Sequence, residues 1–142
     1  MDIKELINTA KLATKHSYAP YSGFCVGAAL LCADGRIFSG CNIENSAFSP
    51  TVCAERVAFF KAISEGYVKH DDFVAIAVVA KKDDEYRAFF PPCGICRQVM
   101  LEFCNYNSFE IIVANESSYK SYKLSELIPQ AFSPDRVARN EK

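Results

Sequence analysis

Apolar residues near the N-terminus recur every three or four positions, which predicts an amphipathic helix over residues 2–16. The positions that would share its apolar face are Ile3, Leu6, Ile7, Ala10 and Ala13. The mostly apolar stretch 24–33 fits a buried strand, and Asp34-Gly35 marks a tight turn after it. Residues 36–41 then run back as a second strand.

Ser49 followed by Pro50 is typical of a helix start, because serine caps helix N-termini and proline suits the first helical position. A second helix is therefore expected from there to about Glu65, with Gly66 just after its end. The segment from Phe73 to Ala80 is apolar at every position, as in a central strand that is covered on both faces.

The charged segment from Lys81 to Arg87 is interpreted as a loop. Pro91-Pro92 precede a third helix over about residues 93–105, and two further strands are expected at 109–114 and 119–124. This order of elements predicts an α/β fold with three layers, in which helices cover the faces of a mixed five-stranded sheet.

The composition is that of an ordinary folded protein, and the length of 142 residues predicts a single domain over 1–142. Half of the residues are apolar and the net charge is −1, which argues against a disordered chain and against nucleic acid as a partner. The longest apolar run has eight residues, whereas a membrane helix needs about 20. The N-terminus has no secretory pattern, so we expect a cytoplasmic protein.

Seven cysteines are many for this length, and without a secretory signal we expect reduced thiols with metal-binding or catalytic use. Cys93 and Cys96 are one helical turn apart, at the start of the third predicted helix. Cys53 lies near the start of the second predicted helix. Helix N-termini stabilise thiolates, and three converging thiolates can bind Zn²⁺ with its fourth position open.

Cysteine spacing alone leaves other interpretations open. A Cys-x-x-Cys pair at a helix start also fits a thiol redox site built on Cys93 and Cys96. The remaining cysteines are interpreted as small core residues, although one of them could complete a structural four-cysteine zinc site. They are Cys25, Cys32, Cys41 and Cys104.

Five motifs in order along the chain resemble the small zinc-dependent cytidine deaminases, and the resemblance spans almost the whole chain. They are Pro20-Tyr21-Ser22-Gly23-Phe24, Val26-Gly27-Ala28-Ala29, Asn42-Ile43-Glu44-Asn45, Cys53-Ala54-Glu55-Arg56 and Pro92-Cys93-Gly94-Ile95-Cys96-Arg97-Gln98. The resemblance implies a cytidine deaminase-like fold. It also implies hydrolysis of cytidine, and of deoxycytidine, to uridine or deoxyuridine and ammonia in pyrimidine salvage.

The resemblance implies a zinc site made by Cys53, Cys93 and Cys96, with Glu55 beside the metal and not bound to it. Zinc lowers the pKa of a bound water to about 7, which gives a nucleophile for C4 of the base. Ring nitrogen N3 must then gain a proton and the amine must leave as ammonia. One carboxyl group, that of Glu55, could carry both protons.

Charge bookkeeping suggests a role for Arg56, because Zn²⁺ with three thiolates carries a net charge of −1. Arg56 is three residues after Cys53 and hence a neighbour on the helix surface. A nearby cation would draw charge off the sulfur atoms, and three-cysteine relatives are similar in having arginine there.

The family pattern also implies the substrate contacts. Asn42 and Glu44 would bind the sugar, the backbone N–H of Ala54 would face the base carbonyl, and Phe24 and Phe132 would pack on the pyrimidine.

Small chains of this family form homotetramers, so Phe132 would reach the site of a neighbouring subunit. Many relatives have tyrosine where this chain has Phe48, and that hydroxyl helps to hold the ligand from a neighbour. Ribose binding is therefore expected to be weaker here, or to use another group.

Two further functions are weighed against cytidine deamination and the redox alternative. One is the same chemistry on another aminopyrimidine nucleoside such as blasticidin S, and the other is a non-catalytic structural-zinc module. For the deaminase, the expected partners are a small nucleoside substrate and further copies of the chain, with neither nucleic acid nor membrane.

Overall fold

Six strands form one mixed sheet in a computed structural model that describes residues 1–87 and 89–134. In chain order the elements are α1 (Ile3–Ala13), the 3-10 helix η1 (Thr14–His16), β1 (Cys25–Cys32), β2 (Ile37–Cys41), α2 (Ala54–Ser64), the 3-10 helix η2 (His70–Asp72), β3 (Phe73–Lys82), β4 (Glu85–Tyr86), α3 (Gly94–Phe103), β5 (Glu110–Ala114), β6 (Tyr119–Lys123) and α4 (Leu124–Leu127). The strand order is β2-β1-β3-β5-β6, with β4 paired to β3. Strands β3 and β5 are parallel and the other pairs are antiparallel.

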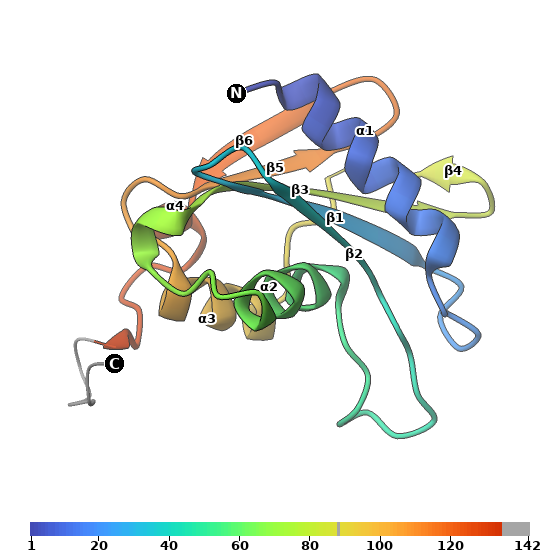
Figure 1. Cartoon of the computed structure of the whole chain (residues 1–142). Helices are drawn as coiled ribbons and strands as arrows, with labels where there is room; N and C mark the ends of the chain where they lie inside the picture. The colour runs from blue at the N-terminus through green and yellow to red at the C-terminus, as the bar shows by residue number, and fades with distance from the viewer. Residues whose placement is uncertain (88, 135–142) are drawn as a thin grey trace.

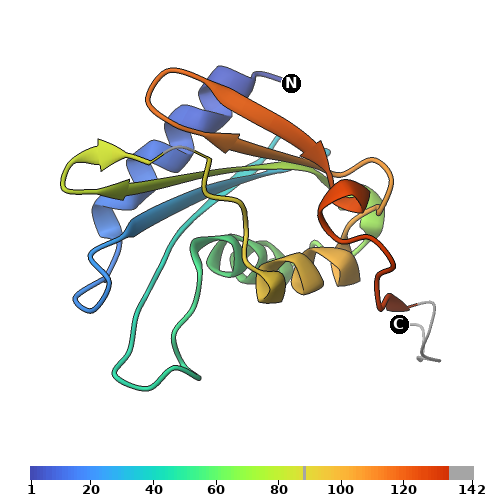
Figure 2. The ribbon, with the colours of Figure 1, turned by 180° about the vertical axis from the view of Figure 1, so that it is seen from behind.

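Helices cover both faces of the sheet, which confirms the predicted α/β class and three layers. Helix α1 lies on one face, and α2 and α3 lie side by side on the other (Figures 1 and 2). Alternation along β3 serves both layers: Ala77 and Val79 belong to the cluster with α1, whereas Ile76 and Val78 belong to the cluster with α2 and α3. This double burial explains why β3 has no polar position in its central part.

Two glycines allow the helices to lie directly against the sheet. A Cβ atom at Gly27 would lie 1.9 Å from the carbonyl oxygen of Ala10 in α1. On the opposite face, a Cβ at Gly40 would lie 2.3 Å from the carbonyl oxygen of Ala54, the first residue of α2. Helix α2 can therefore lie this close to β2 only because Gly40 has no side chain.

The predicted strand count was wrong by one, because β4 lies in the charged segment that was interpreted as a loop. Asp83 and Asp84 both have left-handed backbone, with φ of 52° and 59°. This geometry makes a two-residue hairpin turn, and Glu85–Tyr86 then pairs with the end of β3. A strand of only two residues, an exposed glutamate and a half-buried tyrosine, is too short to show an alternation of apolar and polar positions.

The predicted start of the second helix was also wrong. Ser49 and Pro50 lie in a turn, closed by the Thr51 N–H, which donates to the Phe48 carbonyl at 3.1 Å. The helix begins only at Ala54. The intervening segment is the long loop between β2 and α2 that extends from the body in Figure 1.

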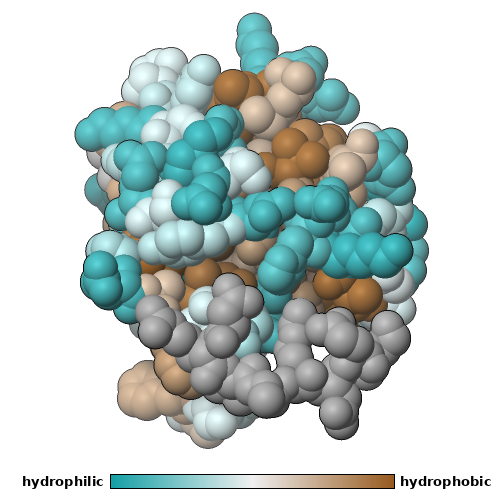
Figure 3. Space-filling view, turned by 90° about the vertical axis from the view of Figure 1, so that its left-hand side faces the viewer, coloured by the Kyte–Doolittle hydropathy of each residue, from teal (hydrophilic) through white to brown (hydrophobic). Residues whose placement is uncertain are grey.

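Polar side chains cover most of the coloured area of the face in Figure 3, with small apolar areas between them. Among the described residues, no helix has both the length and the apolarity that a membrane span requires.

Gly27→Ala should destabilise the fold by roughly 3 kcal/mol or more, because the added methyl meets the backbone of α1. Urea denaturation of the two proteins measures the difference. Gly94→Ala is the matched control, since a Cβ there meets nothing within 4 Å, and its free energy of unfolding should change by about 1 kcal/mol or less. Equal stability of the two variants would contradict the close helix–sheet contact.

Candidate active site and metal centre

The N-termini of α2 and α3 each begin with a cysteine at the capping position. Cys53 precedes α2 with φ −76° and ψ 156°, and Cys93 precedes α3 with φ −68° and ψ 168°. Neither side chain makes a capping hydrogen bond. Cys96 lies in the first turn of α3 and is buried. The three sulfur atoms are thus brought together by two helix ends.

The separations of these sulfur atoms fit one tetrahedral zinc ion. The Sγ atoms of Cys53 and Cys93 lie 3.7 Å apart, those of Cys93 and Cys96 lie 3.6 Å apart, and all three lie within 4.8 Å of one another. Zinc–sulfur bonds of about 2.3 Å at tetrahedral angles require sulfur atoms about 3.8 Å apart. Within the described residues no other group of three potential ligands clusters in this way.

The electrostatics around the three thiols favour a thiolate at Cys53. Its interaction with the Cys96 thiol, together with a hydrogen bond from Arg56, lowers the pKa of Cys53 to about 5 against the opposing effect of burial. The same contact with Cys53 and burial raise the pKa of Cys96. Bringing all three thiols to the thiolate form therefore requires a cation among them, which is what a zinc ion supplies.

Glu55 lies in the first turn of α2 with a side chain that is only 4% exposed. Burial raises the pKa of this carboxyl group to about 7. Its Oε1 atom has no hydrogen-bond partner, which is rare for a buried polar atom. A carboxyl group with a pKa near neutrality can both release and take up a proton under physiological conditions.

Arg56 lies next to the sulfur cluster, as the spacing predicted. Its Nη2 atom donates to the Sγ of Cys53 at 3.4 Å. The guanidinium therefore places positive charge beside the Cys53 sulfur, and it also interacts with the Cys96 thiol.

A pocket of about 250 Å³ opens beside these groups. It is lined by Ser22, Phe24, Val26, Asn42, Glu44, Thr51, Val52, Cys53, Glu55, Val78, Phe90, Pro91 and Cys93. The structure thus brings Phe24, Asn42 and Glu44 to one pocket with Cys53 and Cys93, two of the three cysteines of the cluster.

Two residues predicted to contact the substrate, Ala54 and Phe132, are not among those that line this pocket. Ala54 is fully buried at the first position of α2, where a helix leaves backbone N–H groups without an intrahelical acceptor. Phe132 does not line this pocket, and its ring is 65% exposed. Its backbone carbonyl accepts a hydrogen bond from Gln98 on α3 at 2.9 Å.

Asn42 also has a structural role that the sequence did not predict. Its Oδ1 accepts from the Val26 N–H at 2.9 Å, and its Nδ2 donates to the Phe24 carbonyl at 2.8 Å. The amide therefore fixes the start of β1 and keeps one donor and one acceptor position for a ligand.

Phe90 was missed in the sequence, although it comes two residues before the Pro92-Cys93 motif. Its ring stacks on Phe24, with centroids 5.1 Å apart and planes at 29°. The Nζ of Lys82 lies 4.6 Å from the centroid of the Phe24 ring. Among eleven phenylalanines, no sequence pattern separates this one from a core residue.

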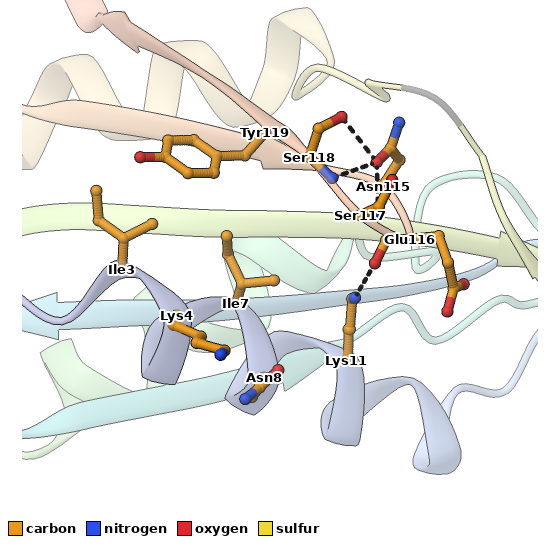
Figure 4. A pocket seen from close by; sticks show the side chains of 10 residues that line it. All are labelled: Ile3, Lys4, Ile7, Asn8, Lys11, Asn115, Glu116, Ser117, Ser118 and Tyr119. Atoms are coloured by element: carbon orange, nitrogen blue, oxygen red, sulfur yellow. Dashed lines mark hydrogen bonds between the residues drawn. The ribbon is translucent and has the colours of Figure 1, made fainter.

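A larger pocket of about 500 Å³ lies between α1 and the turn that joins β5 and β6 (Figure 4). Lys11 donates to the Glu116 carbonyl at 3.1 Å across it, and Asn115 holds the turn by accepting from the Ser117 and Ser118 N–H groups. None of the described residues that line it is a cysteine, so the size of a pocket does not by itself identify the candidate active site.

Residues 1–110 match a family model described as "Cytidine and deoxycytidylate deaminase zinc-binding region". The chain is 48% identical over 139 residues to the cytidine deaminase of Sporosarcina psychrophila, covering 97% of this chain and 96% of the relative. It is 45% identical over 135 residues to that of Halalkalibacterium halodurans, covering 95% and 97%. The crystal structure of cytidine deaminase from Burkholderia pseudomallei matches with a TM-score of 0.84 and 41% identity, covering 93% of this chain and 100% of that chain.

The fold and the cysteine cluster thus define a zinc-binding deaminase of the nucleobase-modifying class. Within that class, the chain belongs to the cytidine deaminase family.

We expect about one Zn²⁺ per chain, bound through the three sulfur atoms. Cys93→Ser should weaken zinc retention at least tenfold, because a hydroxyl is a poor replacement for a thiolate, whereas Cys25→Ser, outside the cluster, should retain zinc. Elemental analysis after dialysis against a chelator measures both. A zinc-free protein with a reversible Cys93–Cys96 disulfide would instead support the redox alternative.

Proposed function

We propose that this protein hydrolyses the C4 amine of cytidine, and of deoxycytidine, to give the uracil nucleoside and ammonia. The observation that carries this proposal is the pairing of three sulfur atoms at tetrahedral spacing with the unpartnered carboxyl oxygen of Glu55 on one pocket. A structural zinc site needs no such carboxyl group, and a redox dithiol needs no third cysteine. The named relatives favour cytidine over other aminopyrimidine nucleosides.

The proposed mechanism assigns the proton transfers to Glu55. Cys53, Cys93 and Cys96 would hold the zinc ion, which when bound would lower the pKa of a water molecule and so provide a nucleophile at neutral pH. Glu55 takes up the proton that the attacking water loses and delivers it to ring nitrogen N3. The same carboxyl group then carries the remaining proton of the added oxygen to the amine, the C4–N bond breaks, and the amine leaves as ammonia.

The remaining pocket residues bind and orient the nucleoside. The Phe24 and Phe90 rings form an apolar wall for the flat base. Asn42 and Glu44 keep hydrogen-bonding capacity for sugar hydroxyls. The lining residues in the described part of the chain include two carboxylates and no Lys or Arg, which disfavours a nucleotide phosphate and supports a nucleoside substrate.

Glu55→Gln should retain zinc and bind cytidine, yet lose turnover by a factor of 10⁴ or more. A single general acid–base step contributes about 10²–10⁴-fold, and this group serves two. Absorbance-monitored deamination of cytidine, with zinc content as the control, measures the effect. Turnover within about tenfold of the parent would contradict the mechanism and leave the fold intact.

Arg56 is proposed to reduce the negative charge of the zinc–thiolate site through its contact with Cys53. Arg56→Ala should fold normally but lose about 10–100-fold in turnover or zinc affinity, as is common for groups that contact metal ligands. Arg36→Ala is the matched control, because Arg36 pairs with Glu65 at the far end of α2. Unchanged turnover and zinc content in Arg56→Ala would reduce Arg56 to a surface residue.

We further propose a homotetramer in which Phe132 completes the site of a neighbouring subunit. The 65% exposed Phe132 and the 97% exposed Phe48 support this, since most of each side chain is left uncovered by its own chain. Phe48 has no hydroxyl group, so its contribution would be limited to apolar contact.

Mixing Phe132→Ala chains with Glu55→Gln chains tests the shared site. Each variant alone should be impaired, and mixed oligomers should regain activity because an intact Phe132 then meets an intact Glu55. Subunit exchange is verified by mass spectrometry. Absence of recovery despite exchange would show that Phe132 serves its own chain.

We place the protein in the cytoplasm, where reducing conditions keep thiols available for zinc. All seven cysteines are free, which supports this placement.

A further inference from the structure

A chain of hydrogen bonds runs from Glu44 to the segment that carries the Phe24 ring. The Glu44 Oε1 accepts from the backbone N–H groups of Tyr21 and Ser22, at 3.0 and 3.2 Å. The Ser22 hydroxyl donates to the other carboxylate oxygen of Glu44. The same hydroxyl oxygen accepts from the Phe24 N–H at 3.1 Å.

The direction of these bonds is fixed by the chemistry of their ends. An ionised carboxylate can only accept and a backbone amide can only donate, so the single hydroxyl proton of Ser22 must point to Glu44. The bond from Ser22 is also the main reason why the pKa of Glu44 is lowered, which keeps the carboxylate charged. Ser22 therefore links a charged group to a backbone amide through one oxygen atom.

Phe24 is held at both ends of its backbone. Its carbonyl accepts from Asn42, and its N–H donates to Ser22. Its ring lines the pocket and stacks on Phe90. The backbone that carries the ring is thus held directly by Asn42 and, through Ser22, by Glu44, the two side chains proposed to bind the sugar.

We propose that Ser22 is a positioning residue that couples sugar recognition at Glu44 to placement of the Phe24 ring against the base. The inference rests on the proposed function for the identity of the ligand, and on the hydrogen bonds of Ser22 for the coupling. A sugar hydroxyl at Glu44 acts on the same carboxylate that orients Ser22. Recognition of the two halves of a nucleoside is therefore not independent.

Steady-state kinetics on cytidine test the role of the hydroxyl. Ser22→Ala should raise KM roughly 10–100-fold, the value of a hydrogen bond to a charged group, with kcat changed less than about threefold. Ser22→Thr should restore KM, because Ser22 is exposed and an added methyl can face solvent. Ser118→Ala is the control, since its hydroxyl donates to Asn115 at the opposite pocket. An unchanged KM in Ser22→Ala would overturn the proposal.

A double-mutant cycle separates coupling from independent contacts. In a Glu44→Ala background, adding Ser22→Ala should change kcat/KM by less than about twofold, because the link is already broken. If the fold-changes in kcat/KM of the two single substitutions multiplied in the double variant, the two sites would be independent and the proposed coupling would be wrong. Zinc content and thermal unfolding of every variant exclude loss of the fold as the cause.

Amide hydrogen exchange tests the link without relying on turnover. Exchange at the Phe24 N–H should accelerate roughly tenfold or more in both Ser22→Ala and Glu44→Ala, whereas the Val26 N–H, held by Asn42, should be unchanged. A parent protein that does not deaminate cytidine would refute the proposed function, while this measurement still decides the link. Equal Phe24 exchange in parent and Ser22→Ala would refute the link even in an active enzyme.

Discussion

Three sulfur atoms from two helices must meet within bonding distance of one metal ion, and this constraint organises the rest of the molecule. It requires the N-termini of α2 and α3 to lie side by side on one face of the sheet. The chain meets this requirement with two strand–helix–strand connections that share β3 and place both helices on the same face. Each helix then begins with a cysteine whose side chain is not used for capping.

The same geometry gathers negative charge, which the surroundings must balance. Three thiolates, Glu55 and Glu44 all face or adjoin one pocket. The compensating charges are a zinc ion, the guanidinium of Arg56 and the positive ends of two helix dipoles. Burial leaves the Glu55 carboxyl with a pKa near 7, so it need not add a permanent charge. The site therefore combines a strongly held metal with a proton carrier that can change state.

Much of the architecture could be predicted from the sequence because its signals are periodic and local. The amphipathic pattern of α1, the uniformly apolar β3 and the paired cysteines all follow from spacing. The two errors concerned β4 and the start of α2. In both places the prediction relied on a few neighbouring residues, without a repeated apolar pattern that would mark a buried face. Ser49-Pro50 carries the composition of a helix start, yet the bridge between Ile43 and Val52 holds this region as a loop.

Within the site, the sequence predicted the type of chemistry better than it predicted the contacts between side chains. The pairing of Cys93 with Cys96 follows from helical spacing, whereas the third ligand Cys53 and the role of Glu55 came from the resemblance to the cytidine deaminases. The second role of Asn42, the Phe90 stack and the Ser22 link depend on segments distant in sequence. Spacing along the chain carries no record of such contacts, because a hydrogen bond between β1 and the segment after β2 needs the folded register.

Gly40 gives the metal centre an unexpected dependence on a residue that touches no metal. The backbone of α2 rests on this position at the helix end that presents Cys53. Any side chain at this position would push the start of α2 away from the sheet and so move the Cys53 sulfur away from those of Cys93 and Cys96. A mutation of Gly40 would therefore impair zinc binding by the protein, even though all three cysteines remained present.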